Sequence, residues 1–149
     1  MYEFIWKKSR YKLFISKWNI AIILEAGYKI LSDIEDKDKY IKISENIYFY
    51  SSLLPYPDSQ TLTMEELECF CKGLKLVNNQ ILETIQGKSC LITLRSIQFS
   101  DCNIQDEGFV ACAIQWASEI FGFPMPVINV SFDYLEEPYG KYIFDFSHI

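Results

Sequence analysis

The stretch Asn103–Gly122, NIQDEGFVACAIQWASEIFG, places two carboxylates directly before a long apolar segment. Apolar residues recur around Trp116 at spacings of three and four, which predicts a helix with a buried face, and Gly122 ends it. Neighbouring helix residues point about 100° apart, so Asp106 and Glu107 are not expected to share one proton or one substrate. We interpret them as acids that start a helix, where its dipole favours them, and that belong to an acidic surface.

Around this stretch the chain reads as an ordered globular domain. It has 149 residues, half of them hydrophobic, with 11 Phe, 10 Tyr and 3 Trp. One hydrophobic core suffices at this length, so we expect a single domain over residues 1–149. The five cysteines are an odd number, which argues for reduced thiols and against a disulfide framework. No signal peptide is expected in MYEFIWKKSR, and no apolar run approaches the roughly 20 residues of a membrane span, so we expect a cytoplasmic protein.

The rest of the chain alternates between strand and helix patterns. Helices are expected over residues 19–32 and, after a capping box formed by Thr63 and Glu66, up to Gly87. Two short strands around a turn at KKSR are favoured over 2–17, although a helix also fits this segment. A strand or a hairpin is expected over 40–52, a buried strand over 89–99, and strands on either side of EEPYG near the end. This order predicts an α+β fold: a mostly antiparallel sheet with about three helices packed on it.

Motifs for a cofactor or a nucleophile are missing from the sequence. There is no phosphate-binding glycine loop and no nucleophile elbow. Cys69 and Cys71 are two residues apart on a predicted helix, so their thiols face different directions and do not suit a zinc site. His148 is the single histidine and lies near the end of the chain, where residues are often poorly ordered. We therefore expect no metal, no cofactor and no enzymatic activity.

The charge of the chain is uneven. The net charge is −6, but residues 1–17 contain five basic side chains and one acidic one. From Asp101 onward there are eight acidic residues and one basic residue. This last third would repel a nucleic acid and attract a basic protein.

Tyrosines and acids occur together in FDYLEEPYGKY, a predicted turn between two strands. Tyrosine is a common interface anchor, and carboxylates complement arginine and lysine on a partner. The predicted partner-binding residues are Asp101, Asp106, Glu107, Asp133, Glu136, Glu137 and Tyr139.

In length, acidity, unpaired cysteines and aromatic content, the chain resembles the immunity proteins of bacterial contact-dependent inhibition and other polymorphic toxin systems. The resemblance implies that the protein binds a cognate toxin domain, often a basic nuclease, and blocks it. Negative patches on such an inhibitor imitate the charge of nucleic acid and speed the capture of a basic partner. The expected function is thus that of a toxin-neutralising immunity protein whose acidic last third forms the binding face.

Two other functions stay open at the level of the sequence. A small enzyme could bring Asp101, Asp106, Glu119 or Asp133 together as acid and base in a pocket. A homo-oligomeric adaptor could instead set the basic N-terminal ribbon, with Lys7, Lys8, Arg10 and Lys12, against the acidic face of another copy.

Overall fold

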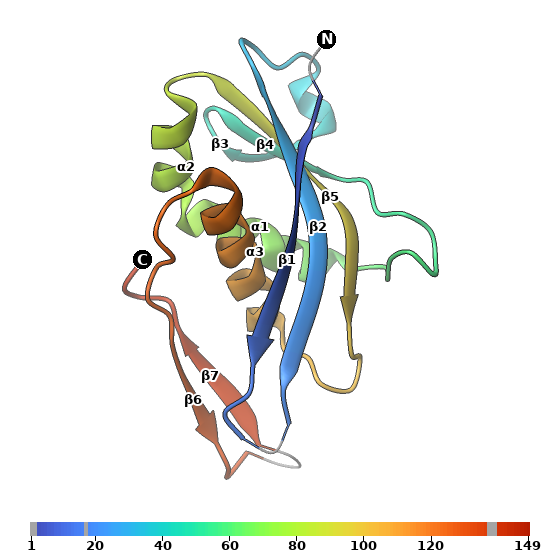
Figure 1. Cartoon of the computed structure of the whole chain (residues 1–149), viewed down its shortest axis with the longest axis vertical. Helices are drawn as coiled ribbons and strands as arrows, with labels where there is room; N and C mark the ends of the chain where they lie inside the picture. Colours follow the sequence, from blue (N-terminus) through green and yellow to red (C-terminus); the bar gives the residue numbers. More distant parts are fainter. Residues whose placement is uncertain (1–2, 17, 137–139) are drawn as a thin grey trace.

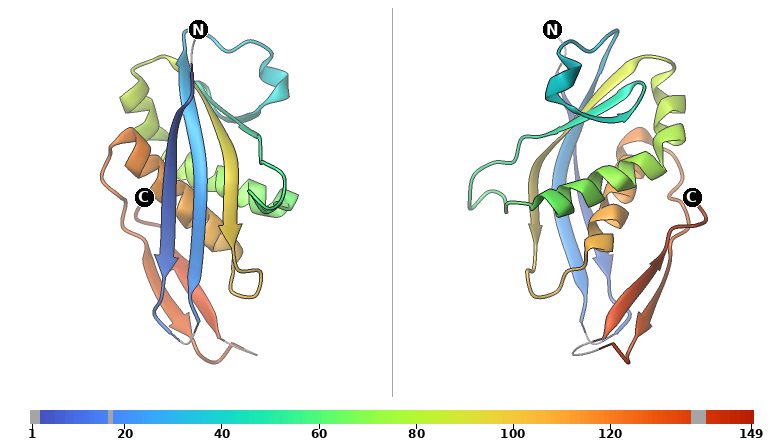
Figure 2. Two further views of the ribbon diagram at one scale, coloured as in Figure 1. Left: turned by 45° about the vertical axis from the view of Figure 1, so that its right-hand side comes forward. Right: turned by 180° about the vertical axis from the view of Figure 1, so that it is seen from behind.

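The computed structural model describes residues 3–16, 18–136 and 140–149. Its main sheet has five strands in the spatial order β1-β2-β5-β4-β3, and the α-helices lie on one face of it (Figures 1 and 2). Neighbouring strands are antiparallel except β4 and β5, which are parallel. The strand bounds are Ile5–Leu13 for β1, Ile20–Leu31 for β2, Ile41–Ser44 for β3, Ile47–Ser51 for β4 and Ser89–Phe99 for β5. The predicted α+β fold with a mostly antiparallel sheet is confirmed.

The helix predicted from the quoted stretch is α3, Asp106–Phe121, and it fills the centre of the core. Trp116 is completely buried, and its ring N–H donates a hydrogen bond of 3.2 Å to the carbonyl oxygen of Ala26 in β2. Gly122 adopts the left-handed conformation (φ 80°) that ends the helix. The prediction of a helix with a buried tryptophan face is confirmed.

The second predicted helix is divided into α1, Met64–Leu76, and α2, Asn78–Ile85. Thr63 and Glu66 form the predicted capping box at its start. The backbone leaves the helical conformation at Val77, where two asparagines follow. Asparagine is a weaker helix former than the residues around it, which is consistent with a break at this point.

Helices α1 and α3 touch closely at Gly73. A Cβ atom added to this glycine would overlap the carbonyl oxygen of Val110 and would lie 2.8 Å from the Cβ of Ala113. Gly73 therefore permits the backbone of α1 to approach α3 more closely than any other residue would.

The helix predicted over 19–32 is wrong, because this segment forms strand β2. Every second side chain from Ile20 to Ala26 is buried, which is the repeat of a strand. Three isoleucines in this part of the strand are β-branched and favour an extended backbone. β2 is also paired along both edges, with β1 and with β5, and these pairings lie too far apart in sequence to be seen in its own pattern.

The turn predicted at KKSR is also wrong. β1 runs through these residues without a break, and the chain reverses between Leu13 and Ile20 instead. KKSR contains no glycine, proline or asparagine, the residues that most tight turns require. Ser9 and Tyr11 are buried on the helix side. Lys8, Arg10 and Lys12 alternate with them and therefore lie on the opposite face of the sheet.

The remaining strand predictions are confirmed. β3 and β4 form the hairpin, β5 is the buried strand, and β6 (Asn129–Asp133) pairs with β7 (Lys141–Asp145) as a separate antiparallel ribbon. A single turn of 3-10 helix, η1 (Lys37–Lys39), links β2 to β3. In the described ranges, no helix has the length and apolar character needed to cross a membrane.

Candidate partner-binding surface

Tyr142 of β7 attaches the β6–β7 ribbon to the main sheet. Its side chain is completely buried, and its hydroxyl donates to the carbonyl oxygen of Trp18 at 2.5 Å. The same hydroxyl accepts a hydrogen bond of 3.3 Å from the backbone N–H of Ile15. The rings of Trp18 and Phe132 pack edge-on against the Tyr142 ring, with centroids 4.9 and 4.8 Å away. The ribbon is thereby fixed to the turn between β1 and β2.

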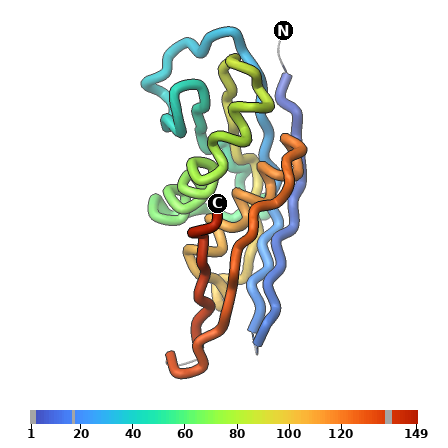
Figure 3. Tube along the Cα trace, turned by 90° about the vertical axis from the view of Figure 1, so that its left-hand side faces the viewer, coloured from blue at the N-terminus to red at the C-terminus, as the bar shows by residue number. Residues whose placement is uncertain are grey.

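Gln105, the residue before α3, makes a second attachment to Tyr142. Its side-chain amide donates to the carbonyl oxygen of Tyr142 at 3.0 Å and accepts from the N–H of Tyr142 at 2.7 Å. This reciprocal pair imitates one step of a strand pairing. The start of α3, strand β7 and the turn between β1 and β2 therefore meet at one residue, at the same end of the molecule (Figure 3).

Large apolar side chains are exposed at this end. The exposed fractions are 73% for Phe14 and 50% for Ile15 in one turn, and 67% for Tyr134 and 90% for Leu135 in the other. Exposed apolar groups gathered in this way on an ordered surface are typical of a protein-binding site. We call this surface the tip, and define it as Phe14, Ile15, Asp133, Tyr134, Leu135 and Glu136.

The acids of the tip belong to a structured turn. A carboxylate oxygen of Asp133 accepts a hydrogen bond of 2.9 Å from the N–H of Leu135. The carbonyl oxygen of Glu136 accepts one of 2.7 Å from the N–H of Gly140, which has a φ of 84°. These local bonds hold the backbone that carries both apolar side chains and both carboxylates. The predicted residues Glu137 and Tyr139 lie outside the described residues.

Asp101 lies at the same end as the tip, in the exposed loop after β5. The strand register places Phe99 beside Ile22, so Asp101 follows close to the start of β2. Its carboxylate accepts a hydrogen bond of 3.4 Å from the side chain of Gln60. The loop after β5 and the turn of the β6–β7 ribbon both lie toward the lower end of the molecule in Figure 1, although they come from separate parts of the sequence.

Asp106 and Glu107 form a second acidic group, on the helix side. They lie in the first turn of α3 and face α1, where Glu68 and the half-buried Cys69 are their neighbours. Burial raises the pKa of the Cys69 thiol, and the negative charges of Asp106, Glu107 and Glu68 raise it further against the opposing effect of Lys72. The structure therefore places these two acids beside one another on a helix surface, apart from the acids of the tip.

The carboxylates of the enzyme hypothesis contact different partners. Glu119 accepts a hydrogen bond of 2.5 Å from the hydroxyl of Ser9. Asp101 accepts one from Gln60, and Asp133 accepts one from the N–H of Leu135. Asp106 lies in the first turn of α3, on the helix side. Among residues 3–16, 18–136 and 140–149, no group of three or more His, Cys, Asp or Glu side chains is placed to hold a metal ion. No structural observation brings two of these four carboxylates together.

The only histidine has an acidic neighbour. The Nε2 atom of His148 lies 3.7 Å from a carboxylate oxygen of Asp145, and both side chains are exposed. Hydrogen bonds from Ser147, together with the nearby imidazole, lower the pKa of Asp145. This contact fits a surface ion pair between neighbouring residues of the chain end.

The thiols differ in burial, and we expect them to differ in reactivity. Burial raises the pKa of Cys71 to about 11 and that of Cys90 to about 12, and it also raises that of the fully buried Cys112. Because the thiolate is the reactive form, these three should react with a thiol reagent only on unfolding, whereas Cys102 is exposed and Cys69 half-buried. Mass spectrometry after timed alkylation should find Cys102 modified first and Cys69 next. Rapid native labelling of Cys90 or Cys112 would contradict the packing described above.

Of the apolar residues of the tip, the sequence patterns indicate only Tyr134, within FDYLEEPYGKY. The alternation over 2–17 predicts Phe14 and Ile15 in a strand, because the turn is expected at KKSR. Leu135 falls at the predicted end of a strand. A usable signal was present: the turn between two strands is normally polar, and FIS and YLE place large apolar side chains beside serine and acids.

Comparison with known proteins gives no relative. No protein-family model, no curated protein and no solved structure matches the chain. The side chains of the tip and of the neighbouring acidic groups are therefore the basis on which a function is inferred.

Proposed function

We propose that this protein is an immunity protein that binds a cognate toxin domain, with a basic surface such as that of a nuclease, and blocks it. The binding site is the tip together with Asp101, and the acidic group at Asp106 and Glu107 extends the negative field toward the helices. In this proposal the protein inhibits the toxin domain by binding it in a stoichiometric complex, without catalysing a reaction.

The observation that carries this proposal is the combination of exposed apolar side chains and carboxylates on a fixed end of the molecule. Apolar anchors surrounded by charged groups have the composition of a protein interface, with a desolvated centre and a polar rim. The hydrogen bonds of Tyr142 hold both turns in place before a partner arrives. Such preorganisation lowers the entropic cost of binding.

The charge distribution supports a basic partner. The carboxylates of Asp101, Asp133 and Glu136 lie at the same end of a chain whose net charge is −6. Like-signed charges gathered at a binding surface accelerate association with an oppositely charged protein, and salt weakens this acceleration. A basic toxin domain would meet both the long-range field and the apolar anchors.

The variant D101K/D133K/E136K tests the electrostatic part of the proposal. The ligand is the product of the gene immediately upstream, which the proposal expects to be a secreted protein with a basic C-terminal domain. We expect the association rate to fall by about tenfold or more at low salt, because attraction becomes repulsion, and its salt dependence to be lost. Surface plasmon resonance at several salt concentrations measures both quantities.

Two further variants separate the tip from the overall charge. E35K/D38K/E83K changes three exposed acids elsewhere by the same total charge and should keep at least most of the association rate. Leu135→Ser leaves the charge unchanged and should mainly accelerate dissociation, because an apolar anchor is lost. If both triple variants slow association equally, the tip is not the binding site; if no upstream basic domain binds the wild-type protein, the proposed function is wrong.

A further inference from the structure

The face of the sheet opposite the helices is basic along one edge. Lys8, Arg10 and Lys12 alternate with the buried residues of β1, so all three side chains lie on this face and are exposed. In register, Arg10 is beside Ile23 and Lys12 beside Ala21 of β2. Arg10 and Lys12 therefore lie beside two apolar residues of the neighbouring strand, and Lys8 lies beside Glu25.

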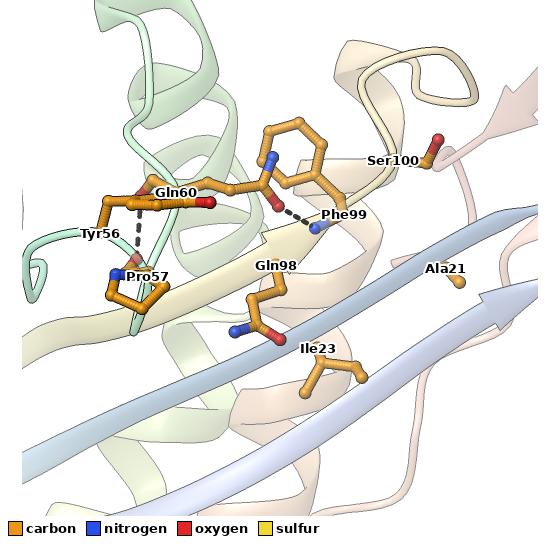
Figure 4. Close-up of a pocket in the computed structure, with 9 residues that line it drawn as sticks. Ala21, Ile23, Tyr56, Pro57, Gln60, Gln98, Phe99 and Ser100 are labelled. Carbon is orange, nitrogen blue, oxygen red and sulfur yellow. Dashed lines mark hydrogen bonds between the residues drawn. The ribbon is translucent and has the colours of Figure 1, made fainter.

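A hollow of about 500 Å³ lies on the same face, next to these apolar residues. Figure 4 shows Ala21 and Ile23 on one side of it, and Gln98 and Phe99 of β5 and the loop residue Tyr56 on the other. Tyr56 is 87% exposed and stands at the rim. We call the hollow and the three basic side chains of β1 the basic face.

The wall of the hollow is fixed to the sheet. The loop after β4 runs along β5, with the N–H of Gln60 donating to the carbonyl oxygen of Ile97 at 2.9 Å and the N–H of Ile97 donating to the hydroxyl of Ser59 at 3.0 Å. The side-chain oxygen of Gln60 accepts from the N–H of Phe99, as Figure 4 shows. These bonds hold Ser59 and Gln60 of the hollow's wall against β5.

The aromatic groups farther along this face do not provide a platform for nucleic acid bases. Arg95 lies at an irregularity in the pairing of β2 and β5, and its guanidinium donates two hydrogen bonds, of 3.0 and 2.7 Å, to Glu25. The same guanidinium stacks on Trp6 at 3.8 Å from the ring centroid, and the ammonium of Lys29 lies over Phe4 at 4.9 Å. Cations of the protein itself already cover the rings of Phe4 and Trp6. Toward the other end of the same face, Arg10, Lys12 and the hollow beside Ala21 and Ile23 are open to a partner.

We propose that the basic face binds the tip of a second copy of this chain, giving a two-fold symmetric dimer. Arg10 and Lys12 make no ion pair within residues 3–16, 18–136 and 140–149, and Lys8 lies opposite Glu25, whose carboxylate is already bound by Arg95. The basic face thus offers positive charge and an apolar hollow, and the tip offers carboxylates and exposed apolar side chains, so the two surfaces complement each other in charge and in chemistry. The dimer would use the same tip as the proposed toxin site, so the two partners would compete for it, but the dimer itself needs only groups that this chain carries.

The position of the two surfaces favours a closed pair. Lys12 of the basic face and Phe14 of the tip are two residues apart, and the hollow is lined by Phe99 and Ser100 at the end of β5 that leads to Asp101. Since the tip adjoins the basic face, a two-fold axis between them lets each copy contribute both surfaces at once. Two contacts then form for one association event, and no open surface is left to extend the assembly into a filament.

The oligomeric state tests this inference. We expect the wild-type protein, of 17.5 kDa, to show twice that mass in sedimentation equilibrium at about 0.02 M salt and to approach the monomer mass at about 1 M salt, where charges are screened beyond roughly 3 Å. K8E/R10E/K12E should be monomeric at both salt concentrations. This variant leaves the tip intact, so it should still bind the toxin domain, which separates failure of the dimer from failure of the proposed function.

A charge-swapped variant is the decisive control. K8E/R10E/K12E/D101K/D133K/E136K reverses both surfaces and keeps the net charge of −6, so it should regain the dimer. Circular dichroism identifies any variant that does not fold. The inference is overturned if the wild-type protein is monomeric at low salt, if K8E/R10E/K12E dimerises as well as the wild type, or if the folded charge-swapped variant stays monomeric.

Discussion

Replacing Tyr142 by alanine is expected to lower the free energy of unfolding by about 3–5 kcal/mol, the range for truncating a large buried aromatic side chain. The substitution should also make local opening easier, because Tyr142 connects the β6–β7 ribbon to Trp18 and Ile15. Hydrogen exchange should accelerate most in the ribbon and in the turn between β1 and β2. Urea denaturation gives the total change in stability.

Tyr142→Phe isolates the hydroxyl. It keeps the ring but removes the hydrogen bonds to the carbonyl oxygen of Trp18 and from the N–H of Ile15, both of them partly buried, which is expected to cost about 1 kcal/mol or more. Tyr56→Phe makes the same chemical change at a side chain that is 87% exposed and should leave stability unchanged. If Tyr142→Phe is as stable as the wild type and the ribbon exchanges at the wild-type rate, the hydroxyl does not hold the tip.

Gly73→Ala is expected to destabilise the protein even though alanine is the better helix former. The propensity gain is about 1 kcal/mol. The added Cβ, however, meets the backbone oxygen of Val110 and the Cβ of Ala113, so α1 and α3 must separate. Because a backbone atom cannot rotate away as a side chain does, we expect a net loss of about 2 kcal/mol or more, read from the midpoint of thermal or urea unfolding.

Gly108→Ala is the matched control for this change. Gly108 is also a buried helical glycine, but a Cβ there would meet only side-chain methyl groups, the nearest being that of Ile20 at 3.3 Å. Such contacts relax by a few tenths of an ångström, so the change should stay within about 1 kcal/mol of zero. Equal destabilisation by both substitutions would mean that the close approach at Gly73 is not the cause.

The helices could be predicted from the sequence because their patterns are local. The capping box at Thr63 and Glu66, the left-handed glycine at 122 and the spacing of apolar residues around Trp116 all lie within one or two helical turns of each other. The strand β2 could not be predicted in this way. β2 is apolar on its buried face, but Ile23 and Ile30 are apolar at half-exposed positions as well. The sequence of β2 therefore does not alternate strictly between apolar and polar residues, and the spacing of its apolar residues also fits a helix.

The charge of the candidate surface was visible in the sequence, but its shape was not. The surplus of acids from Asp101 onward predicts a basic partner, which stays a prediction, and the tip contains Asp133 and Glu136. The partners of the tip could not be inferred, because the turn at Phe14 was assigned to the wrong residues. The hydrogen bond from Tyr142 to Trp18 spans 124 positions, and no local pattern in one sequence connects residues so far apart.

That span has a consequence for synthesis of the protein. Phe14 and Ile15 are synthesised more than a hundred residues before Tyr142, the residue that holds their turn. Until Tyr142 has been added, the chain has neither the β6–β7 ribbon nor the buried hydroxyl, so the two turns of the tip cannot be held together. The tip therefore assembles only after synthesis has passed Tyr142.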